Sequence, residues 1–190
     1  MQPLRLSLSC LLAALVVAGC ATDTNKTSAK VALKPASGSQ VIGNAWLVQE
    51  GDHVVVQARV SGLTPNREHG FHVHEKGDCS SPDASSAGGH FNPTQKLHGS
   101  PAGEHHAGDL PSLKADAGGN AVTSFELKGV LLGSGATDFM GKALVVHADP
   151  DDYTSQPAGN SGKRIACGVI GTPATPGGVG GSAQTNPKQM

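Results

Sequence analysis

The sequence predicts an all-β domain, and three observations carry that prediction. The 190 residues include 26 glycines and 12 prolines, which indicates many turns. Apolar and polar residues alternate over short runs, and no helical pattern of any length is present. Apolar residues make up 37% of the chain, enough for one modest core, so we expect one domain with extensions at both ends.

Strands are expected at six places in the chain. Residues 40–49 and 53–60 read as a hairpin around the turn Glu50-Gly51-Asp52. A strand is predicted at 69–75, after the loop 61–66, and another at 121–127, after the turn Asp116-Ala117-Gly118-Gly119-Asn120. The last two are predicted at 141–147 and 165–170.

Two long irregular stretches interrupt this pattern, at residues 76–111 and 148–163. Structureless loops of this length inside a compact domain are usually functional. We therefore expect both loops to be functional, and the first of them holds the remaining ligand-type residues.

The N-terminus has the pattern of an export signal. Arg5 precedes a short apolar run at residues 11–17, which is too short to span a bilayer as a mature helix. The run ends in Val17-Ala18-Gly19-Cys20, which resembles the lipobox of bacterial lipoproteins. That resemblance implies removal of residues 1–19, lipidation of Cys20 and membrane attachment through it.

The other reading of this end is ordinary secretion, with Cys20 lost or left free. Ala21 after the cysteine resembles an outer-membrane rather than an inner-membrane sorting signal. We expect the protein on the periplasmic side of a bacterial cell envelope. Residues 20–39 are expected to form the lipidated end and a flexible tether. Residues 40–171 would form the folded domain, and 172–190 a disordered, Gly/Pro-rich tail.

The charge balance excludes one class of partner. The formal net charge is −1, so no basic field exists that would favour nucleic acid. Any attraction of a charged substrate must be local.

Histidines are concentrated in one stretch of the chain. Six of the nine lie between residues 70 and 109, namely His72, His74, His90, His98, His105 and His106. In a strand, His72 and His74 project from the same face because side chains alternate. The strand at 141–147 delivers His147 at its end, so facing strands could supply three nitrogens to one ion. A single histidine is more often a satisfied polar residue, but this series favours a metal site.

The loop supplies a second set of ligands. His90, His98 and His106 are spaced by eight and eight residues, and Asp109 follows as His-x-x-Asp. Three imidazoles and one carboxylate can close a tetrahedral zinc site. Metal coordination would order a loop that is poor in apolar side chains. His105 is the neighbour that competes with His106.

Several motifs together resemble the copper/zinc superoxide dismutases. They are Gly70-Phe71-His72-Val73-His74, Gly89-His90-Phe91-Asn92-Pro93, His106-Ala107-Gly108-Asp109-Leu110, Val145-Val146-His147 and Arg164-Ile165-Ala166-Cys167-Gly168-Val169-Ile170-Gly171. The resemblance covers residues 41–171. It implies a Greek-key, eight-stranded β-barrel or sandwich with two functional loops, a metal-binding loop and an electrostatic loop.

The resemblance also implies the metal ligands, with one copper and one zinc per subunit. Copper would be held by His72, His74, His90 and His147, and zinc by His90, His98, His106 and Asp109, so that His90 bridges the two metals. Asp151 resembles the aspartate that hydrogen-bonds one ligand of each metal, with Asp149 and Asp152 as competitors. His53 and His69 have no role in the family pattern and are expected to be ordinary residues.

Two further roles follow from the resemblance. Cys79 and Cys167 match the family's disulfide, and they are the pair that remains once Cys10 and Cys20 are assigned to the signal region. Arg164 would attract and dock the anionic substrate beside copper.

The implied activity is that of an oxidoreductase. Two superoxide anions and two protons become dioxygen and hydrogen peroxide as copper cycles between Cu(II) and Cu(I), and His90 and Arg164 are the catalytic residues. The stretch 148–163 looks shorter than the electrostatic loop of eukaryotic members, so the residues that steer the anion stay unidentified. The resemblance is compatible with a monomer or a homodimer.

Two other functions compete with the enzyme. One is an exported copper or zinc carrier, or a chaperone-like module, without turnover. The other is a structural or adhesion β-sandwich, which would need no histidine cluster. The complete ligand set together with Arg164 favours the enzyme, which would protect the cell envelope from superoxide.

Overall fold

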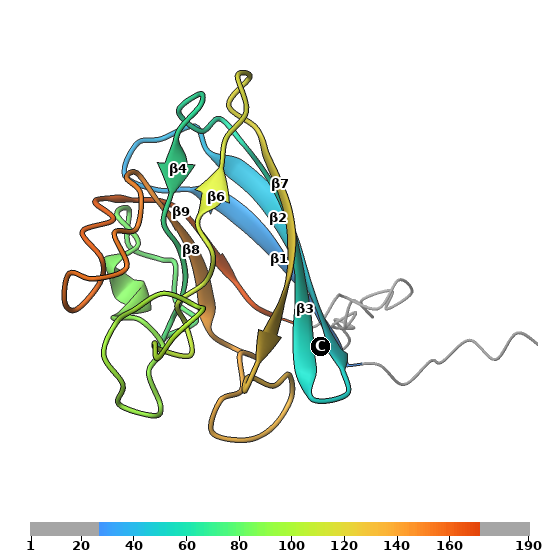
Figure 1. Cartoon of the computed structure of the whole chain (residues 1–190). Helices are drawn as coiled ribbons and strands as arrows, with labels where there is room; N and C mark the ends of the chain where they lie inside the picture. Colours follow the sequence, from blue (N-terminus) through green and yellow to red (C-terminus); the bar gives the residue numbers. More distant parts are fainter. Residues whose placement is uncertain (1–26, 172–190) are drawn as a thin grey trace, which may run out of the picture.

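The computed structural model describes residues 27–171, and these form one all-β unit, as predicted (Figure 1). Its strands are β1 Ser28–Pro35, β2 Ile42–Glu50, β3 His53–Ser61, β4 Glu68–His69, β5 Phe71–His74, β6 Leu113–Lys114, β7 Ala121–Lys128, β8 Ala143–His147 and β9 Arg164–Val169. Within the described part of the chain, the helical content is one 3-10 turn, η1 Ser85–Ala87. No helix of residues 27–171 is long and apolar enough to cross a membrane.

The strands form a curled antiparallel sheet in the order β5-β8-β9-β1-β2-β3-β7, with a small second sheet of β4 and β6. β4 and β5 are separated only by Gly70, so together they count as the one strand expected at 69–75, and the predicted eight strands result. β3 pairs with β7 rather than with the β4 that follows it along the chain. Such a return over a long connection is the Greek-key arrangement.

The prediction of a flexible tether at residues 20–39 is wrong for Ser28–Pro35. This segment is β1, a central strand that pairs with β2 over six residues and with β9 at its end. Ala29, Val31 and Leu33 are buried and alternate with exposed side chains. Because this segment is rich in lysine and small residues, its composition resembles that of a tether and its apolar–polar alternation is inconspicuous. Three inward-facing apolar side chains are nevertheless enough for a half-buried strand.

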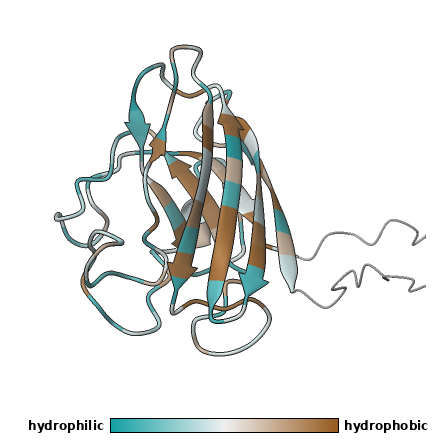
Figure 2. Ribbon diagram, turned by 45° about the vertical axis from the view of Figure 1, so that its right-hand side comes forward, coloured by the Kyte–Doolittle hydropathy of each residue, from teal (hydrophilic) through white to brown (hydrophobic). Residues whose placement is uncertain are grey.

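The core is built by the same alternation in the neighbouring strands. In β3, Val54, Val56, Ala58 and Val60 point inward, while the residues between them are exposed or half-buried. Figure 2 shows the resulting hydrophobic bands along the strands. One continuous apolar cluster therefore fills the inside of the curled sheet.

β5 and β8 differ from the other strands because every one of their residues is buried. Phe71 and Val73 join the main core, and so do Leu144 and Val146 of the neighbouring strand. Their other face is covered by the loops at 75–112 and 148–163, which lie on the same side of the barrel in Figure 1. A site on that face is thus shielded by loops and supported by a packed sheet.

The first of these loops is tied to the barrel wall by the disulfide predicted from the resemblance. Cys79 and Cys167 are bonded, with 5.8 Å between their Cα atoms. The expectations for residues 1–19, for Cys20 and for the tail at 172–190 lie outside the described residues.

Candidate metal centre

The loop residues reach the site by pairing their backbone with β5. His74 and His90 form an isolated bridge, and so do His72 and Asp109. The N–H of Phe91 donates to the carbonyl of Val73, and the N–H of Val73 donates to the carbonyl of Gly108, both at 2.8 Å.

Gly108 is required at this crossing. A Cβ there would lie 2.2 Å from the carbonyl oxygen of Val73 and 3.0 Å from the nitrogen of Phe91, which is too close for any other residue. Two distant stretches of the loop are therefore held against one strand.

Four histidines form a first buried set: His72 and His74 of β5, His147 at the end of β8, and His90 of the loop. Each offers a ring nitrogen, and the four nitrogens lie within 4.8 Å of one another. A bulge between Val146 and His147 shifts the register with β9 at this point, and such bulges re-aim the side chain that follows.

The hydrogen bonds of these rings determine which nitrogen is free. His74 Nδ1 donates to the carbonyl of Gly88 at 2.9 Å, and His147 Nδ1 donates to the carbonyl of Gly162 at 3.3 Å. A carbonyl can only accept, so the proton of each neutral ring is on Nδ1. The two Nε2 atoms then face each other at 3.3 Å with lone pairs and no proton between them. This arrangement fits a cation that both nitrogens bind.

The pKa values of three histidines in the first set are those expected of metal ligands. Burial lowers the pKa of His74 to about 2, lowers the pKa of His147 to about 4 and depresses the pKa of His72 well below its ordinary value. These rings are therefore neutral at physiological pH, which is the form that binds metals.

His90, His98, His106 and Asp109 form a second buried set, again with ligand atoms within 4.8 Å of one another. Asp109 Oδ1 lies 2.8 Å from His90 Nδ1 and 3.2 Å from His106 Nδ1, and its Oδ2 lies 3.1 Å from His98 Nδ1. Burial opposes the charge of Asp109, but the hydrogen bond with His90 and the nearby imidazoles hold its pKa far below the ordinary range.

His90 belongs to both sets. Its side chain is 3% exposed, its Nδ1 faces Asp109, and its Nε2, which has no hydrogen-bond partner, is left for the first set. Within residues 27–171, the buried side-chain nitrogens and oxygens that lack a hydrogen-bond partner are five ring nitrogens. They are Nε2 of His69 and His90 and Nδ1 of His72, His98 and His106. Four of the five are donor atoms of the two sets, and unpaired buried donors of this kind are what bound metal ions would satisfy.

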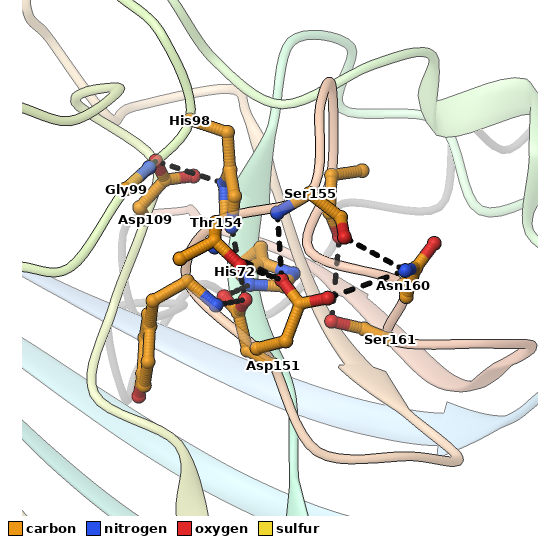
Figure 3. A network of polar contacts seen from close by, with 12 residues as sticks. His72, His98, Gly99, Asp109, Asp151, Thr154, Ser155, Asn160 and Ser161 are labelled. Atoms are coloured by element: carbon orange, nitrogen blue, oxygen red, sulfur yellow. Dashed lines mark hydrogen bonds and ion pairs between the residues drawn. The ribbon is translucent and has the colours of Figure 1, made fainter.

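Asp151 links the two sets, and Figure 3 shows it beside His72 and His98. Its Oδ2 accepts from His72 Nε2 at 2.7 Å and its Oδ1 accepts from His98 Nε2 at 2.9 Å. Each bond leaves the other ring nitrogen free to bind a metal. Of its two competitors, Asp149 is exposed and Asp152 accepts from the backbone of Thr154 and Ser155 in an exposed turn.

The remaining histidines are also accounted for. His105 Nδ1 donates to the carbonyl of His106, and His105 belongs to neither set. His53 is half-buried beside Asp52. His69, expected to be an ordinary residue, is fully buried and donates from Nδ1 to the carbonyl of His147 at 2.9 Å. This support was missed because His69 and His147 are 78 residues apart in the chain, so their hydrogen bond is a tertiary contact.

Arg164 lies beside the first set in a cavity of about 530 Å³. Its Nη1 and Nη2 donate to the carbonyls of Ala84 and Gly88 at 2.7 and 2.6 Å. Gly88 also accepts from His74, so one carbonyl orients both the guanidinium and a histidine of the first set. Apart from histidines, Arg164 is the one charged residue among those that line this cavity.

The loop at 148–163 adds no cation to the cavity. It carries Asp149, Asp151, Asp152 and Lys163, and none of these four lines it. The local attraction of an anion therefore depends on Arg164 and on whatever metal ions the two sets bind.

The fold and the two sets together define a class: β-barrel metalloproteins in which two adjacent, histidine-rich sites share one imidazole. Residues 41–170 match the family model described as Copper/zinc superoxide dismutase (SODC), and the chain belongs to this family.

Similar proteins support this membership. Superoxide dismutase [Cu-Zn] 2 of Aquifex aeolicus (strain VF5) is 47% identical over 137 residues, covering 69% of this chain and 80% of that protein. Superoxide dismutase [Cu-Zn] of Paramecium bursaria Chlorella virus 1 is 42% identical, covering 79% and 86%.

Two further matches are described only as superoxide dismutase-like. The superoxide dismutase-like protein YojM of Bacillus subtilis (strain 168) is 41% identical, covering 65% of this chain and 66% of that protein. The crystal structure of a SOD-like protein from Bacillus subtilis superposes with a TM-score of 0.68 at 36% identity, covering 74% of this chain and 97% of the other.

Proposed function

We propose that this protein is a superoxide dismutase, which converts two superoxide anions and two protons to dioxygen and hydrogen peroxide. Copper would be held by His72, His74, His90 and His147, and zinc by His90, His98, His106 and Asp109. The observation that carries the proposal is the convergence of buried, unpaired ring nitrogens on two points that share His90. Bound copper supplies one-electron redox chemistry, and bound zinc supplies positive charge without redox activity.

The residues around the cavity perform the other tasks. Arg164 presents a fixed guanidinium to the cavity and docks the anion there. His90 lines the same cavity, and its Nε2 is the position at which a proton would be held and passed to the product. Gly88 and Gly162 hold the rings of His74 and His147 through their carbonyls, so these ligands need no reorientation during turnover.

The test is superoxide dismutation by the purified protein after loading with copper and zinc, with Arg164→Ala as the variant. Metal content is measured in both. High activity in the parent and strongly reduced activity in Arg164→Ala at equal copper would support the enzyme and the docking role. Full metal occupancy without activity in the parent would refute the proposal.

The alternative is an exported copper or zinc carrier without turnover. This alternative is supported by one relative, YojM, whose name states only that it is superoxide dismutase-like. A carrier needs the metal sets but no anion-docking residue, whereas this chain places a guanidinium in the cavity beside the first set. Activity at full copper occupancy separates the two functions.

The proposal includes a location. The lipobox-like Val17-Ala18-Gly19-Cys20 supports a protein anchored through Cys20 on the periplasmic side. Ala21 favours the outer membrane over the inner membrane. At this location the protein would protect the cell envelope from superoxide. Cys20→Ala should move the protein from the membrane fraction to the soluble periplasmic fraction. Survival of a deletion strain under extracellular superoxide that equals the survival of the parent would contradict the protective role.

A further inference from the structure

The segment 94–98, which ends at His98, buries almost no apolar side chain. Residues 94–97 are all exposed, and Leu97, its one large apolar side chain, is 73% exposed. His98 itself is only 4% exposed. Hydrophobic burial therefore does not hold this segment, and polar contacts must place the ring.

Gln156 makes the contact that places the backbone. Its Oε1 accepts from the N–H of His98 at 3.0 Å, and its Nε2 donates to the carbonyl of His98 at 2.9 Å. One side-chain amide thus satisfies both backbone groups of a residue 58 positions away, as a neighbouring strand would. Gln156 also lines the cavity that contains Arg164.

The same loop holds the ring of His98. Asp151 accepts from His98 Nε2 at 2.9 Å, which leaves Nδ1 facing Asp109 Oδ2 at 3.1 Å (Figure 3). The backbone and the imidazole of one residue of the second set are therefore fixed from two points of the 148–163 loop. With both fixed, little torsional freedom remains for the ring.

We infer that Gln156 is a positioning residue for zinc binding: it aligns the backbone of His98 so that Nδ1 points at the zinc position. It also joins the wall of the cavity to the zinc set. The 148–163 loop thereby serves to preorganise the zinc ligands, a task its residues fit better than steering, because none of its charged side chains lines the cavity. This inference rests on the zinc site of the proposed function.

A comparable contact supports the other end of the segment. The side chain of Asn92 accepts from the N–H of Lys96 at 3.0 Å and donates to its carbonyl at 2.8 Å. That contact stays within one turn, so it shapes the segment locally. Gln156, in contrast, connects the backbone of the segment to the loop that carries Asp151.

The experiment compares Gln156→Met and Gln156→Glu with the parent, using the metal-free, disulfide-bonded full chain. Methionine keeps the length without hydrogen bonds. Glutamate keeps the shape but cannot donate to the carbonyl of His98, so it separates a hydrogen-bonding role from packing. Gln57→Met on the exposed face of β3 is the matched control. The readouts are zinc affinity by chelator competition and the visible absorption of cobalt(II) bound in place of zinc.

Both Gln156 variants should bind zinc about tenfold more weakly, with an altered cobalt spectrum, while copper affinity and the Gln57 variant stay within about twofold of the parent. Zinc affinity and cobalt spectrum equal to the parent in Gln156→Glu would overturn the inference while leaving the zinc site standing. Absence of zinc and cobalt binding in the parent would overturn both the zinc site and this inference. None of these readouts depends on turnover.

Discussion

Replacing Asp151 with asparagine removes one of the two carboxylate oxygens that orient His72 and His98. In the native chain both ring N–H groups and the N–H of Tyr153 donate to this carboxylate, at distances of 2.7 to 2.9 Å. An amide of the same shape has one acceptor oxygen and one NH₂ group. It cannot accept from both rings, so at least one imidazole must change its tautomer or turn away.

The second set, where we propose zinc, should be affected more than the first set, where we propose copper. In the first set, His74 and His147 stay oriented by the carbonyls of Gly88 and Gly162. In the second set, Asp151 is the partner that orients the ring of His98 from outside. Removing such a partner weakens metal binding about 10- to 100-fold, which corresponds to about 1.4–2.8 kcal/mol.

The assay is competition of the purified protein against chelators for zinc and for copper at neutral pH. Asp149→Asn, two positions earlier and exposed, is the control and should bind both metals as the parent does. Zinc affinity in Asp151→Asn equal to the parent, or a loss confined to copper, would refute the reasoning.

Three other outcomes are expected. Arg164→Ala should lower kcat/KM for superoxide at least about tenfold at equal copper, and the rate of the parent, measured by pulse radiolysis, should fall as salt is added; a salt-independent rate would contradict local steering. Breaking the disulfide with Cys79→Ala should lower the free energy of unfolding by about 2–5 kcal/mol, because the bond closes a separation of 88 residues, and urea titration of the metal-free protein would show it; an unchanged midpoint would count against this. Burial lowers the pKa of His147 to about 4, so below pH ~6.5 the unfolded metal-free chain binds a proton that the folded chain excludes. The stability contributed by this neutral ring is complete above pH ~6.5 and falls by up to about 1.4 kcal/mol per pH unit as the pH drops toward 4; denaturation midpoints that do not change between pH 7 and pH 4.5 would show that the ring is not buried.

Much of the site could be predicted because its ligands are chemically distinctive and locally spaced. His72 and His74 share a face by the two-residue period of a strand, and the spacing of His90, His98, His106 and Asp109 places four ligands in one loop. The strands at β2, β3 and β7 were predictable for a similar reason, since their alternating residues are bounded by glycine-containing turns.

Other features escaped prediction because they depend on partners far away in the chain. β1 carries only small and medium apolar residues on its inner face, and its place between β2 and β9 is decided by pairing at both edges. β6 is too short to leave a pattern, and it exists because β4 lies opposite it. The roles of His69 and Gln156 consist of hydrogen bonds to the backbone of residues 78 and 58 positions away.

The all-β class, the candidate metal ligands and the family resemblance could be inferred from the amino-acid sequence, because residue types and short spacings carry that information. Only the folded chain shows which ring nitrogen of each histidine is free, which of three aspartates contacts both His72 and His98, and which side chains hold His98 in place. Those properties depend on hydrogen bonds between loops, and a hydrogen bond exists only where folding brings a donor and an acceptor to about 3 Å.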